Sequence, residues 1–232
     1  MRVVIHQPHY FPWVRDYVKM AKADYFVIYD DVAFQKNGWI NRTKIRDRRD
    51  FLLTIPVHGS CHKKINNIET VDELWKEKHI KSIKIAYQSS KYFNDYFDII
   101  SDTIRASGNN LSDINISTIR MVNSILEMDV KLVKSSELNT VSKKTSRLVD
   151  RCKKLNCDTY ISGYYAIEQY VEQSKFTKEG IKVVWPSFEC KPYAQSKYKD
   201  FIPDLSILDL IMNHPVSFCK EYILNSTLNE LC

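Results

Sequence analysis

The sequence predicts an α/β fold, with a mostly parallel, Rossmann-like sheet, helices on both faces, and an inserted β-hairpin followed by a helical segment. Short β-branched and aromatic runs alternate with segments of helical periodicity, which is typical of parallel sheets. Residues 35–128 break this alternation. The chain of 232 residues is 44% apolar, enough for the core of one α/β domain over residues 1–232 that carries 35–128 as an insertion.

The chain opens with a strand–loop–helix–strand unit. Residues 3–6 and 25–29 are apolar runs bounded by polar residues, as buried strands are, and residues 13–23 have apolar side chains near helical spacing. Within the insertion, turn-forming residues separate two strand-like runs from three helical segments. We expect an antiparallel hairpin from 39–46 and 51–57, and helices at 71–88, 92–106 and 114–128.

The alternation resumes after the insertion. Strands are expected at 131–134, 158–162 and 181–184. Helices are expected at 142–155, where Ser142 is a candidate cap, and at 166–173, 205–213 and 216–224. The carboxyl ends of the parallel strands should meet at one edge of the sheet, which is where ligands bind in open α/β folds.

Composition and charge exclude several classes of protein. The five glycines show neither G-x-G-x-x-G nor P-loop spacing. The 34 Lys and Arg residues exceed the 28 Asp and Glu residues by 6, and no nucleic-acid motif occurs, so a nucleic-acid partner is disfavoured. The six cysteines form no C-x-x-C pair, and neither an apolar leader nor a run of 18 apolar residues occurs. We expect a cytosolic protein with reduced thiols and no membrane partner.

Polar residues follow the predicted strands where each strand ends. Four clusters stand at such ends: His6-Gln7-Pro8-His9, Asp30-Asp31, Ser162-Gly163 and the stretch after Val184. Their meeting at one sheet edge would create a site, although loops are polar in any protein. His6 is a candidate general base, and Asp30 or Asp31 could orient it. The alternative is a structural histidine with both ring nitrogens satisfied by the backbone.

Metal ligands are not predicted. His6 and His9 have H-x-x-H spacing, but Pro8 between them opposes the helix that this nucleotidyltransferase motif normally opens. His58 and His62 are four residues apart, but Gly59 argues against a helix that would aim both at one ion. No cofactor is identified by the sequence.

The predicted hairpin presents a row of cations. Alternation along the strand places Arg42, Lys44 and Arg46 on one face, and Lys63-Lys64 follows nearby. A diphosphate would relieve the repulsion between these charges, whereas the alternative is a solvated hairpin face. The segment before it is polar and aromatic, as suits contact with a hydroxylated ligand, at Gln35, Asn37, Trp39 and Asn41.

Several motifs together resemble the WbqC-like family. They are IHQPHYFPW, AKADYFVIYDDVAFQKNGWINRTKI, TIPVHGS with KKIN, DTYISG and KPYAQSKYKDFIPDLSILDLIMN, and they span nearly the whole chain in order. The family's opening motif falls on His6, Gln7, Pro8, Tyr10, Pro12 and Trp13. Its second block falls on Asp30, Asp31, Gln35, Trp39, Asn41 and Arg42. Its late blocks fall on Ser162, Gly163, Tyr193, Gln195, Leu205, Ser206, Asp209 and Asn213. At His9 the family more often has asparagine, and at His214-Pro215 a glycine is commoner.

The resemblance implies a cytosolic step on a nucleotide-linked amino-deoxysugar in the biosynthesis of bacterial O-antigen or another surface polysaccharide. The leading hypothesis is a transferase that moves an acyl or aminoacyl group, from a donor the sequence does not identify, to the sugar amine. His6 would act as base and the N–H groups of Ser162-Gly163 would stabilise an oxyanion. One alternative is a nucleotidyl- or adenylate-forming enzyme. Another is a non-catalytic partner that presents a nucleotide-sugar to a glycosyltransferase. The sequence leaves open whether the protein forms a homo-oligomer.

Overall fold

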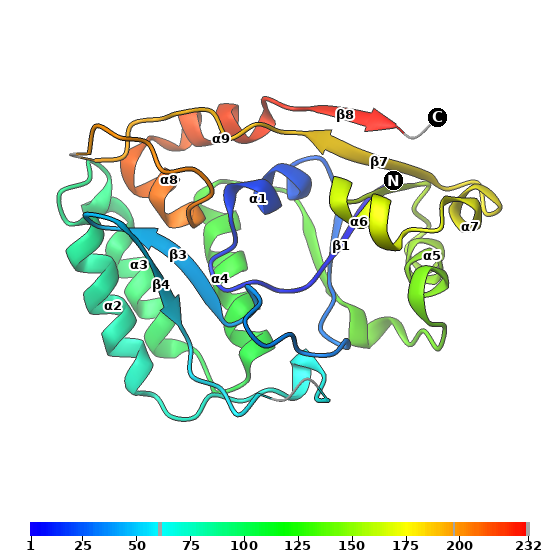
Figure 1. Cartoon of the computed structure of the whole chain (residues 1–232), viewed down its shortest axis with the longest axis horizontal. Helices are drawn as coiled ribbons and strands as arrows, with labels where there is room; N and C mark the ends of the chain where they lie inside the picture. The colour runs from blue at the N-terminus through cyan, green and yellow to red at the C-terminus, as the bar shows by residue number, and fades with distance from the viewer. Residues whose placement is uncertain (60–61, 197, 231–232) are drawn as a thin grey trace.

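The central element is a six-stranded sheet. The computed structural model describes residues 1–59, 62–196 and 198–230. The strands lie in the order β5-β2-β1-β6-β7-β8. All neighbouring pairs are parallel except β7 and β8, which lie side by side and run in opposite directions (Figure 1). Their bounds are β1 Arg2–His6, β2 Tyr25–Ile28, β5 Lys131–Lys134, β6 Thr159–Ile161, β7 Lys182–Ser187 and β8 Thr227–Glu230. The predicted α/β class is confirmed.

The strand order places a switch point beside β1. Counted along the chain, the five parallel strands stand in the order 3-2-1-4-5, which is the Rossmann arrangement. The chain builds outward from β1 through β2 to β5, then returns to the other side of β1 for β6 and β7. A crevice therefore opens at the carboxyl ends of β1 and β6, where the connections leave in opposite directions.

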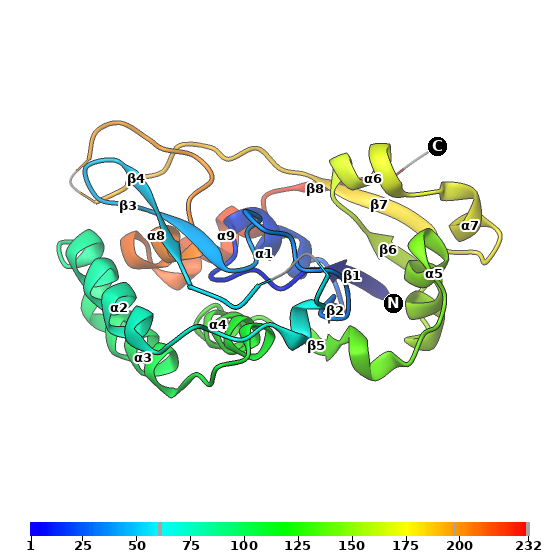
Figure 2. The same cartoon turned by 60° about the horizontal axis from the view of Figure 1, so that its bottom comes forward.

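Side-chain alternation divides the core between the two faces of the sheet. Val4 and Phe26 face a cluster that includes α1 (Val14–Met20), α4 (Leu111–Ile125), α8 (Ile207–Asn213) and α9 (Val216–Leu224). Val3 and Val27 face a second cluster with α5 (Lys144–Lys154), α6 (Tyr164–Tyr170) and α7 (Gln173–Thr177). Figure 2 shows these two groups of helices on opposite sides of the sheet, so the prediction of helices on both faces is confirmed.

The segment between β2 and β5 contains the hairpin and three helices. The hairpin joins β3 (Arg42–Arg46) to β4 (Asp50–Thr54), and η1 (Ile65–Asn67), α2 (Leu74–Tyr87) and α3 (Phe93–Ala106) come before α4. Thr43 Oγ1 donates to the Phe11 carbonyl at 2.9 Å, and Ser206 N donates to the Lys44 carbonyl at 2.8 Å. The hairpin is thus fastened to the loop after β1 and to the start of α8. Its status as an insertion in a single domain stays a prediction.

Three local features differ from expectation. The Asn110 side chain caps α4 by accepting from Asp113 N at 3.1 Å, so that helix begins at Leu111 instead of residue 114. Ser142 does not cap α5, which begins after Lys143 without a side-chain cap. Strand β8 was not expected, because its sequence TLNE is mostly polar and none of its residues is fully buried. In the described ranges 1–59, 62–196 and 198–230, no helix is both long and apolar enough to cross a bilayer.

Candidate functional site

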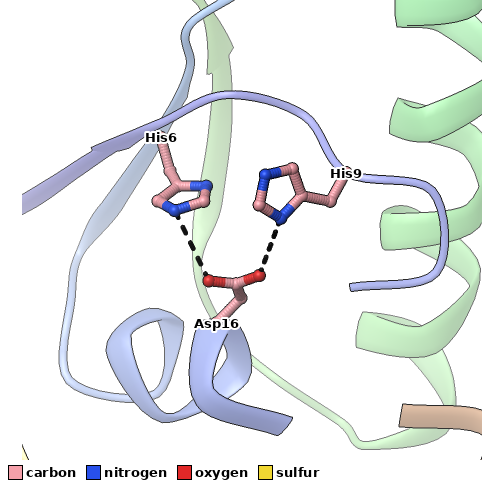
Figure 3. Close-up of side chains that lie close together, drawn as sticks. All are labelled: His6, His9 and Asp16. Atoms are coloured by element: carbon pink, nitrogen blue, oxygen red, sulfur yellow. Dashed lines mark hydrogen bonds and ion pairs between the residues drawn. The ribbon is translucent and has the colours of Figure 1, made fainter. Parts of the chain in front are cut away.

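Three side chains converge where β1 ends. His6 is the last residue of β1, His9 follows in the loop, and Asp16 lies in the first turn of α1. Asp16 Oδ1 lies 3.5 Å from His6 Nε2, and Asp16 Oδ2 lies 3.1 Å from His9 Nδ1. The two imidazole rings meet edge to face with centroids 4.7 Å apart. Figure 3 shows both rings directed at the one carboxylate, which the helix presents from the opposite side.

The loop from Gln7 to Trp13 reverses direction to make this convergence. Tyr10 and Phe11 are fully buried, and Phe11 adopts a positive φ of 41°. Asn115 Nδ2 on α4 donates to the Pro8 carbonyl at 2.9 Å. These anchors draw the middle of the loop into the core, so that His9 returns to the start of α1.

Lys19 completes the cluster. Its Nζ lies 2.8 Å from Asp16 Oδ1, one helical turn away, and both side chains are buried. Burial alone would raise the pKa of Asp16, but Lys19, His6 and His9 hold that pKa well below its usual range. Burial and the Lys19 charge lower the pKa of His6 to about 3. At neutral pH the cluster therefore contains an ionised carboxylate and an uncharged His6.

The hydrogen bonds of His6 define which nitrogen is free. His6 Nδ1 lies 2.9 Å from the Gln7 carbonyl oxygen, which can only accept, so Nδ1 carries the ring proton. Nε2 then has a lone pair and points toward Asp16 Oδ1. This nitrogen is the basic atom of the site.

The His6 cleft lies beside the cluster, at the switch point of the sheet. It has a volume of about 770 Å³ and is lined by His6, Gln7 and His9, by Tyr29 after β2 and Tyr160 of β6, by the start of α5, and by α6 with the two residues that follow it. The α5 residues are Lys144, Thr145 and Leu148, and the remaining wall is formed by Ile5, Ala166, Glu168, Gln169, Val171 and Glu172.

Comparison with known proteins identifies the family. The family model described as the WbqC-like protein family matches residues 7–220. The chain belongs to the WbqC-like family. It is also 28% identical over 216 residues to Uncharacterized protein Rv1507c of Mycobacterium tuberculosis, an alignment that covers 91% of this chain and 93% of that protein. No solved structure matches.

In this WbqC-like protein the contact predicted for Asp30 or Asp31 is made by Asp16. Asp30 accepts from Ser136 N at 3.0 Å and from Ser136 Oγ at 2.7 Å. Asp31 accepts from Ser135 Oγ at 2.6 Å and pairs with Arg147 and Arg151 of α5. Both aspartates thereby hold η2 (Ser135–Leu138) and α5 in place, and so build a wall of the cleft.

The hairpin cations do not line the His6 cleft in the described part of the WbqC-like chain. Arg46 is buried, donates to Gln195 Oε1 at 2.6 Å and stacks on the Tyr198 ring at 4.3 Å. Lys44 pairs with Asp50 at 3.8 Å. Arg42 donates to the Asn37 carbonyl and lies over Trp39. The predicted alternation is correct, but the protein's own groups meet these charges.

Arg42 instead lines a second pocket of about 190 Å³ with Asn37 and Asn41. Asn41 is itself held there, because its side chain donates to the Ile55 carbonyl at 2.8 Å. Gln35 and Lys64 are exposed nearby. The substrate contacts predicted for these residues stay predictions.

Other predicted residues lie in the core or in loop anchors. Tyr10 is buried beside His79, with its hydroxyl 3.1 Å from His79 Nδ1. Trp13 packs against Trp39 with centroids 4.4 Å apart. Ser162 N donates to the Val184 carbonyl at 2.9 Å, so this N–H is not free to stabilise an oxyanion. Gly163 is the N-cap residue of α6, which begins at Tyr164.

The late family block forms a buried polar cluster around α8. Gln195 accepts from Ile202 N at 2.9 Å, and Asn213 accepts from Ser196 Oγ at 2.6 Å. Burial raises the pKa of Asp209 to about 6, against the lowering effect of the adjacent Tyr193 and Tyr87 hydroxyls. The two hydrogen bonds fix the loop before α8, and the bond from Arg46 to Gln195 joins this loop to the hairpin.

Sequence reasoning missed Asp16 and Lys19. Their spacing of three residues in the first helix was visible, but it is common on exposed helix faces. Both are buried here, at 5% and 7% exposed. The residues of α5 and α6 that line the cleft were also missed, because they lie more than 130 residues after His6.

Proposed function

We propose that this WbqC-like protein transfers an acyl or aminoacyl group to the amine of a nucleotide-linked deoxysugar. The reaction would be a cytosolic step in the biosynthesis of a bacterial surface polysaccharide such as O-antigen. One observation carries the proposal: an uncharged His6 lines a cleft of about 770 Å³ at the switch point of a Rossmann-ordered sheet.

The proposed step is proton removal by His6. The uncharged sugar amine attacks the acyl carbonyl, the N–C bond forms, and His6 Nε2 takes the amine proton as the donor's leaving group departs. Asp16, 3.5 Å away, would stabilise the resulting imidazolium. Because the pKa of His6 is about 3 in the free protein, its basicity must rise when substrate binds. A bound diphosphate brings negative charge into the cleft that His6 lines and acts in that direction.

The cleft suits a nucleotide-sugar in size and chemistry. Binding sites for small molecules have volumes of about 300–1,000 Å³. Tyr29 and Tyr160 offer aromatic surface, and Glu168 and Glu172 offer acceptors for hydroxyl or amine groups. Lys144 and the start of α5, which has no side-chain cap, favour an anion at that end of the cleft. We therefore propose α5, in preference to the hairpin, as the diphosphate contact.

The test combines binding and turnover. Nucleotide-sugars carrying dTDP, UDP or GDP should raise the melting temperature of the full chain if they bind its folded form. His6→Gln should retain this shift and lose transfer to the amino sugar, whereas His58→Gln, at an exposed site, should keep both. Binding with no product from any donor would favour the presenting-partner hypothesis. Absence of any thermal shift would contradict a nucleotide-sugar substrate.

The nucleotidyltransferase alternative is less well supported. Its H-x-x-H motif normally opens a helix, but here α1 begins at Val14, five residues after His9. Release of pyrophosphate from a nucleoside triphosphate in the presence of the sugar would support the nucleotidyltransferase alternative.

A further inference from the structure

We propose that His6, His9 and Asp16 form a binding site for one divalent metal ion of the Zn²⁺ class, with an open coordination position toward the His6 cleft. The proposal goes beyond the transfer reaction and does not depend on it. It stands on the donor set, on the hydrogen bonding of His6 and on the position of the cluster at the cleft.

The three donor atoms are already close to the spacing that a metal requires. One ligand atom from each residue can be chosen so that all lie within 4.8 Å of one another. Ligands of a tetrahedral Zn²⁺, at about 2.0–2.2 Å from the ion, are separated from one another by roughly 3.3 Å. The His6–Asp16 and His9–Asp16 separations are 3.5 Å and 3.1 Å. These two separations are to different oxygens of the Asp16 carboxylate, so an ion would be bound by both oxygens or by one of them after the side chains rotate. His9 would bind through Nδ1 as the tautomer in which that nitrogen carries no proton.

The hydrogen bonding of His6 is that of a metal ligand. Ligating histidines almost always donate their other ring N–H to a carbonyl or carboxylate, which orients the ring. His6 Nδ1–H does so to the Gln7 carbonyl at 2.9 Å. The remaining nitrogen, Nε2, faces Asp16 Oδ1 across 3.5 Å as one acceptor facing another. Such an arrangement is unfavourable unless a positive species lies between or beside the two atoms.

In the metal-free chain Lys19 is that positive species. Its ammonium contacts Asp16 Oδ1 at 2.8 Å, and both groups are buried. A metal ion must move Lys19 from Oδ1 or share the carboxylate with it through Oδ2. Lys19 is therefore a built-in competitor, and its removal should tighten metal binding.

The position of the cluster leaves room for a further ligand. His6 and His9 both line the cleft, while Asp16 approaches them from α1. Three protein ligands and an open position are the usual arrangement at sites where Zn²⁺ binds water or substrate. Two imidazoles and one carboxylate favour Zn²⁺ or Co²⁺ over Mg²⁺, which prefers oxygen ligands.

The first experiment is a titration of the tag-free full chain with Co²⁺, followed by visible absorption, and with Zn²⁺, followed by calorimetry. We expect one ion per chain, the absorption bands of low-coordinate Co²⁺, and no competition from Mg²⁺. His9→Ala and Asp16→Asn should each weaken binding by at least ~10-fold, since each removes a direct ligand. His58→Gln, which alters an exposed histidine outside the cluster, should leave the affinity unchanged.

The decisive variant is Lys19→Met. It should bind the ion more tightly than the natural chain, an effect that weak binding at scattered surface sites would not show. Circular dichroism and thermal melting establish that each variant is folded. Equal affinity in the natural chain and in folded His9→Ala, or no stoichiometric binding in either the natural chain or Lys19→Met, would overturn the proposal. None of these outcomes depends on a sugar substrate.

Discussion

Two buried aspartates beside the sheet make opposite use of their carboxylates. Asp31 is met by Arg147, Arg151 and Ser135, so both of its oxygens have strong donors. Asp16 is met by Lys19 and His9, and its Oδ1 also faces the lone pair of His6. Guanidinium groups do not lose their protons, whereas lysine and histidine can. The first arrangement is suited to holding structure and the second to exchanging protons or cations.

The largest expected effect tests the structural half of this comparison. Asp31→Asn should lower the free energy of unfolding by about 3–5 kcal/mol, because it leaves the fully buried Arg151 without its counter-charge. Asp16→Asn should cost less, because Asp16 pairs with one lysine whereas Asp31 pairs with two guanidinium groups. Urea denaturation at pH 7 measures both. Equal losses in the free energy of unfolding of the two variants would show that both carboxylates stabilise the fold to the same degree.

The second-largest expected effect tests the proposed role of the cluster around Asp16 in catalysis. His6→Gln should reduce the rate of the proposed transfer by about 10²–10⁴-fold, the usual contribution of a general base. Its melting temperature at neutral pH should change little, because glutamine replaces one uncharged polar side chain with another. Single-turnover kinetics with a matched donor and sugar would measure the rate. Unchanged turnover would remove His6 from the mechanism.

Metal binding and base catalysis require the same His6 lone pair. Zn²⁺ should therefore inhibit the proposed transfer over the concentration range in which it binds, and a chelator should restore activity. Lys19→Met should become inhibited at lower Zn²⁺. If Zn²⁺ binds at the site and turnover increases, the site stands and the base assignment is wrong.

Acid should destabilise the protein through His6. Its pKa is about 3 in the folded chain and 6.5 in the reference state, so the unfolded chain binds the extra proton between these values. The contribution of His6 to the free energy of unfolding is fully present above about pH 6.5. It is lost as the pH falls toward 3, by up to about 1.4 kcal/mol per pH unit.

The comparison of His6→Gln with the natural chain isolates this contribution, because His79, whose pKa is lowered to about 4, remains in both. Denaturation curves at several pH values should show a flatter pH dependence in the variant. If the free energy of unfolding changes with pH by the same amount in the variant and in the natural chain, the pKa of His6 is not lowered by folding. The depressed pKa of Asp16 acts in the same direction, but only below its usual pKa of 3.8.

The smallest expected effect separates the hairpin from the cleft. Arg42→Met should change stability by about 1 kcal/mol or less, the scale of its partly exposed cation–π contact with Trp39. It should leave the thermal shift caused by a nucleotide-sugar unchanged, whereas Lys144→Met should reduce that shift. If Arg42→Met reduces the thermal shift and Lys144→Met does not, the hairpin is the diphosphate contact.

Local sequence was sufficient for most elements of the fold. The strand Lys131–Lys134 and the helix Val216–Leu224 have the predicted bounds. Periodicity succeeds in such segments because a buried face and helical or strand geometry impose it directly. It fails for β8, whose polar residues form a strand only because the edge of β7 is available to pair with them. The candidate base was also visible, since His6 ends a predicted strand.

The partners of that base were decided by tertiary structure. Asp16 reaches His6 because burial of Tyr10 and Phe11 turns the intervening loop back on itself, and the cleft walls come from helices that β6 and β7 bring to the other side of β1. A residue's type and spacing specify which chemistry it can perform. Which charges surround it, and hence its pKa and its ligands, depend on contacts between segments far apart in the chain. Short-range patterns do not encode those contacts.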